Sequence, residues 1–263
     1  MTIYDEPDLY CAAFDWPLES EVAWLLDRFP LAKTVLEPFC GNARYAPYFA
    51  ARGLTYVGFG NCHAMLARAP RADRITVFHA DARDFTIPHA PPDGFDLAWC
   101  PINSLSHLTS GPDIISHLRC VRRHLATNGC YVVELDPVNH HGPWNDPPGT
   151  ENVWSFDQPD GTTVSASWKR LRCDLHARLG TEQSTFWRTR ANQVLAEVSQ
   201  THHMRMWTCH DLRRIPADAG FSIDDRAVIH KDLTPGPDTT LAPQLENTGL
   251  NYFFFLRPTS PDR

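Results

Sequence analysis

The sequence predicts an α/β fold in which a mostly parallel sheet is covered by helices on both faces. Between residues 33 and 135, short apolar runs of strand type alternate with segments of helical periodicity, a pattern typical of parallel sheets. The first apolar run ends in a turn around Gly41, which brings bare backbone to the edge of the sheet. After residue 136, a proline-rich stretch and further strand-like runs predict a separate β-rich insertion.

The individual elements follow from periodicity and from turn residues. Strands are expected at 33–37, 54–58, 74–78, 95–100 and 130–135, and helices at 44–52, 62–69 and 112–126. Thr208 can cap a helix that Gly220 ends, and two last strands are expected at about 221–228 and 250–257. Ahead of the sheet, residues 10–28 carry apolar side chains at helical spacing, which predicts an amphipathic helix on the sheet or over its mouth.

The insertion has a different character from the core. Its first part, 136–149, is rich in proline and cannot be helical. Strand-like runs follow at 151–156, 162–168, 183–190 and 193–199. We therefore divide the chain into an N-terminal helical segment over the active site (1–32), a core (33–136 and 208–263) and a β-rich lid (137–207).

Composition sets bounds on the function. With 263 residues, 43% of them hydrophobic and 21% charged, the chain fits one decorated domain better than two. The net charge of −7 and the lack of a Lys/Arg run give no reason to expect nucleic acid or an anionic membrane as a partner. The start is acidic, and no apolar run approaches the roughly 18 residues of a membrane span, so a cytoplasmic location is expected.

Metal chemistry is not expected. The eight cysteines stand singly, with no CxxC pair, whereas a zinc site needs closely spaced ligands. Residues 201–210 contain several histidines but show no matching spacing of carboxylates or imidazoles. Burial as small apolar side chains is the better interpretation of the cysteines.

The most informative motif is Glu37-Pro38-Phe39-Cys40-Gly41-Asn42-Ala43-Arg44, a buried strand that enters a glycine turn and then a helix. Such a turn lets the backbone pass close beneath a nucleotide cofactor, although two or three glycines are usual and this motif has one. About twenty residues later, the second strand should end in a carboxylate for the ribose hydroxyls. Phe59-Gly60-Asn61 stands there instead, so Asn61 is the nearest polar candidate.

Residues 37–65 resemble the first two motifs of class I S-adenosylmethionine (SAM) methyltransferases. Residues 80–85 resemble the family's loop after the third strand, and residues 95–108 resemble its fourth strand and the loop that follows. The resemblance extends from about residue 10 to residue 256. It implies a Rossmann-like seven-stranded class I methyltransferase fold with a β-rich lid insertion, as in small-molecule methyltransferases. It also implies that Glu37 orders the glycine turn and that Asp81 lies beside the adenine amine.

Ligands of such sheets bind at the carboxyl ends of the strands, which selects the candidate residues. The candidates for cofactor binding are Glu37, Phe39, Gly41, Asn61, Asp81, Ala82 and Cys100, and those for catalysis are Asn103, His107, Asp136, His140 and Arg205. Asp136 and His140, with the adjacent His141, could supply a general base, a general acid and an anion stabiliser. Arg205 could clamp an anionic substrate or pair with a carboxylate across the lid. His107 could act in the site or pack beneath its loop.

Three functions stay open at this point. The absence of a carboxylate at Gly60 and the reduced glycine turn favour a methyltransferase-fold enzyme of natural-product metabolism that works without SAM. It would catalyse base-assisted elimination or intramolecular ring closure, for example formation of a small aza ring by loss of an anionic leaving group. The alternative is a SAM-dependent methyltransferase that acts on a small-molecule N, O or C centre, and a second alternative is a non-catalytic binding subunit. The expected cofactor is thus none or SAM, and the expected partners are a small-molecule substrate, anionic or carrier-bound, and a companion protein subunit.

Overall fold

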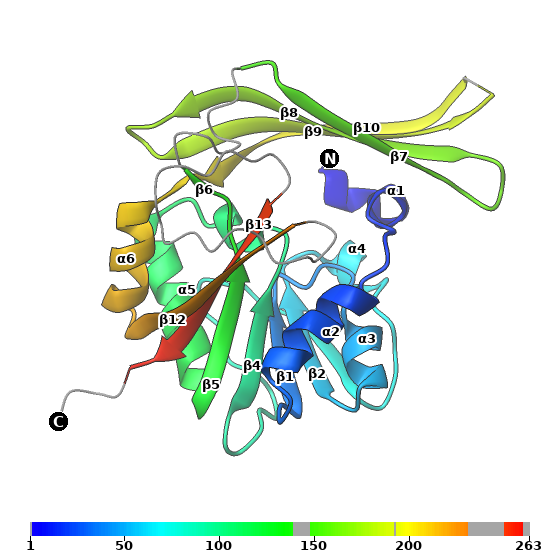
Figure 1. Ribbon diagram of the computed structural model, residues 1–263. Helices are drawn as coiled ribbons and strands as arrows, with labels where there is room; N and C mark the ends of the chain where they lie inside the picture. The colour runs from blue at the N-terminus through cyan, green and yellow to red at the C-terminus, as the bar shows by residue number, and fades with distance from the viewer. Residues whose placement is uncertain (1, 139–147, 192, 231–249, 260–263) are drawn as a thin grey trace.

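The computed structural model describes residues 2–138, 148–191, 193–230 and 250–259, which form two layered sheets and their covering helices (Figure 1). The larger sheet is seven-stranded, in the order β12-β13-β5-β4-β1-β2-β3. Its strands are β1 (Thr34–Pro38), β2 (Thr55–Gly60), β3 (Ile75–His79), β4 (Phe95–Cys100), β5 (Leu125–Glu134), β12 (Phe221–His230) and β13 (Leu250–Pro258). Strands β1 to β5 run parallel, and β13 is antiparallel to both of its neighbours.

Helices cover both faces of this sheet, as Figure 1 shows. One face packs against α2 (Glu19–Arg28) and α3 (Ala46–Ala51), and the other against α5 (Gly111–His124) and α6 (Cys209–Asp218). Each face has its own cluster of buried apolar side chains. The sheet is therefore buried on both sides, as a parallel sheet must be to keep its apolar strands from water.

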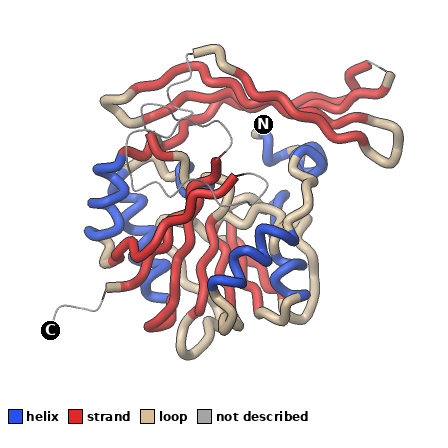
Figure 2. Tube along the Cα trace, in the orientation of Figure 1, coloured by secondary structure: helices blue, strands red, loops and turns tan. Residues whose placement is uncertain are grey.

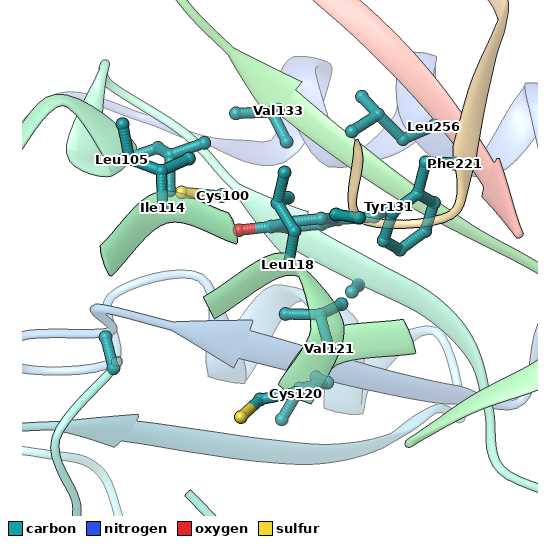
Figure 3. Close-up of a cluster of buried hydrophobic side chains, with 14 of the residues drawn as sticks. Cys100, Leu105, Ile114, Leu118, Cys120, Val121, Tyr131, Val133, Phe221 and Leu256 are labelled. Carbon is teal, nitrogen blue, oxygen red and sulfur yellow. The ribbon is translucent and has the colours of Figure 1, made fainter. Parts of the chain in front are cut away.

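Helix α5 illustrates why these segments form helices. Ser110 precedes it, and its Oγ accepts a hydrogen bond of 3.2 Å from the backbone N–H of Asp113. Ile114, Leu118 and Val121 then recur at helical spacing and form one apolar stripe. Figure 3 shows this stripe against the side chains of the sheet. Burying each such aliphatic side chain stabilises the fold by about 1.5–3 kcal/mol.

The second sheet is four-stranded and antiparallel, in the order β10-β9-β8-β7, and we call it the lid. Its strands are β7 (Glu151–Asp157), β8 (Thr163–Asp174), β9 (Leu179–Arg190) and β10 (Gln193–Arg205). Figure 2 shows it as a separate layer across one end of the seven-stranded sheet. Two short strands, β6 (Pro137–Val138) and β11 (Trp207–Thr208), pair in parallel. They bring the start and the end of the insertion together at one point of the core.

The N-terminal segment lies between the lid and the core. It begins with a 3₁₀ turn, η1 (Ile3–Asp5), followed by α1 (Pro7–Ala13). Leu9 and Ala13 pack with Phe186 of the lid in a small apolar cluster. The first residues of the chain therefore link the two layers.

The fold class predicted from the sequence is confirmed. The single helix expected over residues 10–28 is wrong at its centre, because α1 ends at Ala13 and α2 begins at Glu19. Pro17 lies in the break, and proline has no N–H with which to continue a helix. The helix expected at 62–69 is shorter as well, since α4 covers only His63–Leu66. No helix in the described ranges is long and apolar enough to cross a membrane.

Candidate functional site

The turn after β1 presents bare backbone at the edge of the sheet. Phe39, Gly41 and Ala43 adopt left-handed backbone conformations, with φ of 59°, 56° and 54°. A Cβ built on Gly60, at the end of β2, would find Gly41 N as its nearest heavy atom, at 3.8 Å. The two glycines face each other, and this arrangement suits a ligand that passes close to the backbone. The Phe39 ring lies 5.2 Å from the ring of His117, so it packs partly on the core.

Two predicted site residues lie beneath this turn rather than at its surface. Glu37 is buried, and the Tyr56 hydroxyl donates a hydrogen bond of 2.8 Å to its carboxyl group. Burial raises the pKa of Glu37 to about 8, so the side chain is mostly protonated at pH 7. Cys100 ends β4 and is also buried, which raises the pKa of its thiol to about 12. Glu37 therefore links β1 to β2, and Cys100 acts as a neutral packing residue.

Arg44, which the sequence analysis missed, follows the turn. Its Nη1 donates a hydrogen bond of 2.6 Å to Phe14 O, and its guanidinium lies 4.3 Å from the ring centre of Trp16. Its Nε and Nη2 are buried without a hydrogen-bond partner. Burial also raises the pKa of the nearby Glu21 to about 7, so that carboxyl compensates the cation only in part. A guanidinium with two unused donors fits a ligand carboxylate. In the sequence, the position of Arg44 directly after the glycine turn was the signal that could have identified it as a ligand-binding residue.

The carboxylate at the end of β3 is already paired. Asp81 Oδ2 lies 2.5 Å from Arg83 Nη2, and its Oδ1 accepts a hydrogen bond of 2.9 Å from the Arg83 backbone N–H. These bonds lower the pKa of Asp81, so it is ionised at pH 7. Ala82 beside it is buried. Asn61 is exposed, and its backbone oxygen accepts a hydrogen bond of 3.2 Å from His79 Nε2.

The loop after β4 carries two predicted catalytic residues to the underside of the lid. Asn103 Oδ1 accepts a hydrogen bond of 2.5 Å from Ser106 Oγ. His107 ends the short helix η2 (Ser104–His107), and its Nε2 lies 3.4 Å from the Tyr4 hydroxyl. Its ring centre is 6.2 Å from that of His202 on β10. The imidazole keeps accessible surface, yet its surroundings desolvate it and lower its pKa to about 4. It is therefore neutral at pH 7, and one of its ring nitrogens carries no proton.

Sequence reasoning missed Tyr4 and His202. Their contacts with His107 join segments far apart in the chain, which no local pattern reveals. Side chains alternate between the two faces of a strand, and in β10 the half-buried His202 lies between the exposed Thr201 and His203. This alternation was the partial signal that the sequence held. Both ring nitrogens of His202 are buried without a hydrogen-bond partner, and its ring lies 5.0 Å from that of Trp168.

Arg205, another predicted catalytic residue, pairs with a carboxylate of α6. Arg205 is buried, its Nη2 lies 3.2 Å from Asp211 Oδ1, and its Nη1 donates a hydrogen bond of 3.2 Å to Thr109 O. Of its two expected roles, it fills the second, with a carboxylate supplied by α6. Asp136 lies two residues after the end of β5 and is partly buried. His140 and His141 lie outside the described residues, within which no cluster of three or more metal-ligating side chains occurs.

Residues 35–129 match a family model described as a methyltransferase domain. Among similar solved structures is CalS10 from Micromonospora echinaspora, described as an amino pentose methyltransferase, with 21% identity, 97% of each chain covered and a TM-score of 0.68. The sugar N-methyltransferase KedS8 from Streptoalloteichus has 20% identity and a TM-score of 0.67, with 97% of this chain and 93% of that chain covered. CcbJ, a methyltransferase from Streptomyces caelestis, has 16% identity and a TM-score of 0.69, covering 98% and 99%. No curated protein matches the chain.

These identities establish the fold rather than the substrate. The glycine turn after β1, the strand order with its antiparallel last strand, and the lid between β5 and α6 occur together over the whole described chain. The match to the methyltransferase-domain model spans β1 to the first part of β5. The chain thus has the class I methyltransferase fold, in the form that carries a β-sheet lid, and its residues 35–129 match the methyltransferase-domain model.

Proposed function

We propose that this protein is a SAM-dependent methyltransferase that acts on an N, O or C centre of a small molecule of natural-product metabolism. The observation that carries the proposal is the bare backbone shared by Gly41 and Gly60 at the mouth of the sheet. The methyltransferase-domain match and the sugar methyltransferases among the structural neighbours support it. The lid favours an enclosed small-molecule substrate over a macromolecule.

Only part of the site fits SAM. The left-handed turn from Phe39 to Ala43 would lie beneath the ligand, and the unused donors of Arg44 would hold its carboxylate. The ribose has no carboxylate at Gly60, and the adenine partner Asp81 is paired with Arg83. One missing charged hydrogen bond is worth about 1.5–3 kcal/mol, or about 10–100-fold in affinity. We therefore expect SAM to bind, but weakly for an enzyme of this fold.

The acceptor side of the proposed reaction rests on His107. When bound, SAM supplies a methyl group on a sulfonium ion. The neutral imidazole of His107 can take the proton that the acceptor atom loses, and Tyr4 orients the ring through the hydrogen bond at Nε2. Burial raises the pKa of Tyr4 to about 12, so its hydroxyl keeps its proton. Holding the acceptor in line with the methyl group would contribute most of the rate.

Calorimetric titration with SAM and S-adenosylhomocysteine tests the proposal. Mass spectrometry of the purified protein first establishes that neither compound is already bound. Dissociation constants in the micromolar range are the expected result. An absence of binding at millimolar ligand overturns the proposal.

The second candidate is SAM-independent elimination or ring closure at the same site. Two features of the cofactor strands together favour it. Position 60 carries no carboxylate for the ribose, and the carboxylate of Asp81 is already paired with Arg83. His107 would then accept a proton from the substrate nucleophile as an anionic group leaves. The family match and the structural neighbours support methyl transfer instead. The same titration separates the two candidates, because only methyl transfer needs SAM.

A further inference from the structure

The loop after β4 contains a strained two-residue turn. Ile102 and Asn103 both adopt the left-handed conformation, with φ of 48° and 56°. Asparagine tolerates this region, but a β-branched side chain such as that of Ile102 is a true outlier there. Such strain persists only where surrounding contacts oppose relaxation, and it is concentrated at functional sites. The contacts that hold this turn therefore indicate the function of the strained conformation.

The main contact comes from the neighbouring strand. Glu134, the last residue of β5, is buried, and its Oε2 accepts a hydrogen bond of 2.5 Å from the Ile102 backbone N–H. The Ile102 N–H lies in the turn, outside the strand pairings, and this bond satisfies it. A carboxyl oxygen can accept this hydrogen bond in either protonation state of the side chain.

A second set of contacts fixes the far side of the turn. Ser106 Oγ donates a hydrogen bond of 2.5 Å to Asn103 Oδ1 and accepts one of 2.9 Å from Trp207 Nε1. Ser104 Oγ donates one of 2.8 Å to Pro101 O. Trp207 belongs to β11, where the lid returns to the core, so the turn is held from the sheet on one side and from the lid junction on the other.

The turn leads directly into η2, whose last residue is His107. The backbone direction at Ile102 and Asn103 therefore decides where the imidazole lies relative to Tyr4 and His202. We propose that Glu134 is a positioning residue that holds Ile102 and Asn103 in the left-handed conformation and thereby places His107 between the N-terminal segment and the lid. This inference deepens the proposed function, since His107 is its proposed proton acceptor.

The titration of His107, followed by NMR on the full chain without cofactor or substrate, tests this role. A His107→Ala variant assigns the resonance among the thirteen histidines. In the wild type the pKa of His107 is lowered to about 4, with Tyr4 and His202 as the titratable groups that face it. In Glu134→Ala the turn can relax, and we expect the pKa to move by about one unit or more toward its ordinary value near 6.5. Glu134→Gln keeps an acceptor oxygen and is expected to titrate like the wild type.

Glycine at position 102 supplies the decisive comparison. Glycine adopts the left-handed conformation without strain, so Glu134→Ala combined with Ile102→Gly should restore the low pKa of His107. If Glu134→Ala does not fold, Glu134→Asp replaces it, since its carboxylate is one methylene shorter and falls short of Ile102. The inference is overturned if the alanine or aspartate variant titrates like the wild type, or if Ile102→Gly restores nothing. Because no cofactor is present, this result does not depend on whether the protein binds SAM.

Discussion

Gly60 and Gly41 face each other across the mouth of the sheet, with 3.8 Å between Gly41 N and the position that a Gly60 Cβ would take. A side chain therefore fits at position 60 without a clash. Its absence, rather than any obstruction, leaves the ribose of an adenosyl ligand without a carboxylate partner. For the proposed SAM site, position 60 is therefore one of two departures, beside the paired Asp81, and a substitution can supply the missing carboxylate.

Gly60→Asp should tighten SAM binding. The new carboxylate can accept hydrogen bonds from the ribose hydroxyls, and we expect an affinity gain of about 10–100-fold by calorimetry. Gly60→Ala is the matched control, because it fills the same space without an acceptor and should leave the affinity unchanged. Equal affinities for the aspartate and alanine variants would show that the ribose does not lie at this position.

Replacing Arg44 should weaken binding of SAM but not of adenosine. Arg44→Met removes the unused donors that we assign to the ligand carboxylate, and SAM affinity should fall about 10–100-fold. Adenosine lacks this carboxylate, so its affinity should stay the same. Arg44→Lys keeps the charge but not the forked geometry, and an intermediate affinity is expected. Parallel losses for both ligands would indicate that Arg44 only supports the turn.

Gly58→Ala should destabilise the fold, in contrast to the same change at Gly60. A Cβ at Gly58 would lie 2.6 Å from the Tyr56 hydroxyl oxygen and 3.0 Å from Cys40 Cβ. Overpacking of this kind costs about 1–3 kcal/mol. Chemical unfolding of the two alanine variants measures the difference. A Gly58→Ala protein as stable as the wild type would mean that Tyr56 can move away from Glu37.

Glu37→Gln should stabilise the protein more at pH 8 than at pH 5. Burial raises the pKa of Glu37 to about 8 in the folded state, above the ordinary value of 4.5. The folded protein therefore binds more protons in this interval, and its stability falls as pH rises from about 4.5 through 8. Glutamine still accepts the Tyr56 hydrogen bond but cannot ionise, so the advantage should reach the order of 1–3 kcal/mol at pH 8.

Unfolding by denaturant at several pH values measures this trend. Glu19→Gln is the control, since Glu19 lies exposed on the first turn of α2. Its effect on unfolding serves as the baseline for a neutralised carboxylate at the surface. A Glu37→Gln advantage that is equal at pH 5 and pH 8 would mean that Glu37 is ionised in the folded protein throughout.

The fold and the position of the glycine turn were predictable from local sequence patterns. Alternating apolar runs predict a parallel sheet because only strands covered on both faces can be apolar throughout, and Gly41 marks the turn because its backbone must turn sharply there. The break at Pro17 was also visible in the sequence, but the apolar spacing on both sides concealed it. The first functional hypothesis, a SAM-independent enzyme, rested on Gly60 and the reduced glycine turn together, whereas the family match and structural neighbours support methyl transfer.

Tertiary structure decided which side chains meet. Tyr4, His107 and His202 come from the N-terminal segment, the core and the lid, and nothing in their local sequence sets their separation. Arg205 had two sequence-compatible roles, and the position of Asp211 on α6 selected one of them. The sequence by itself determined the sheet, the glycine turn and the lid, because hydrophobic periodicity and turn residues act over a few neighbours. The partners of the buried charges were settled only by packing, which joins residues about a hundred positions apart.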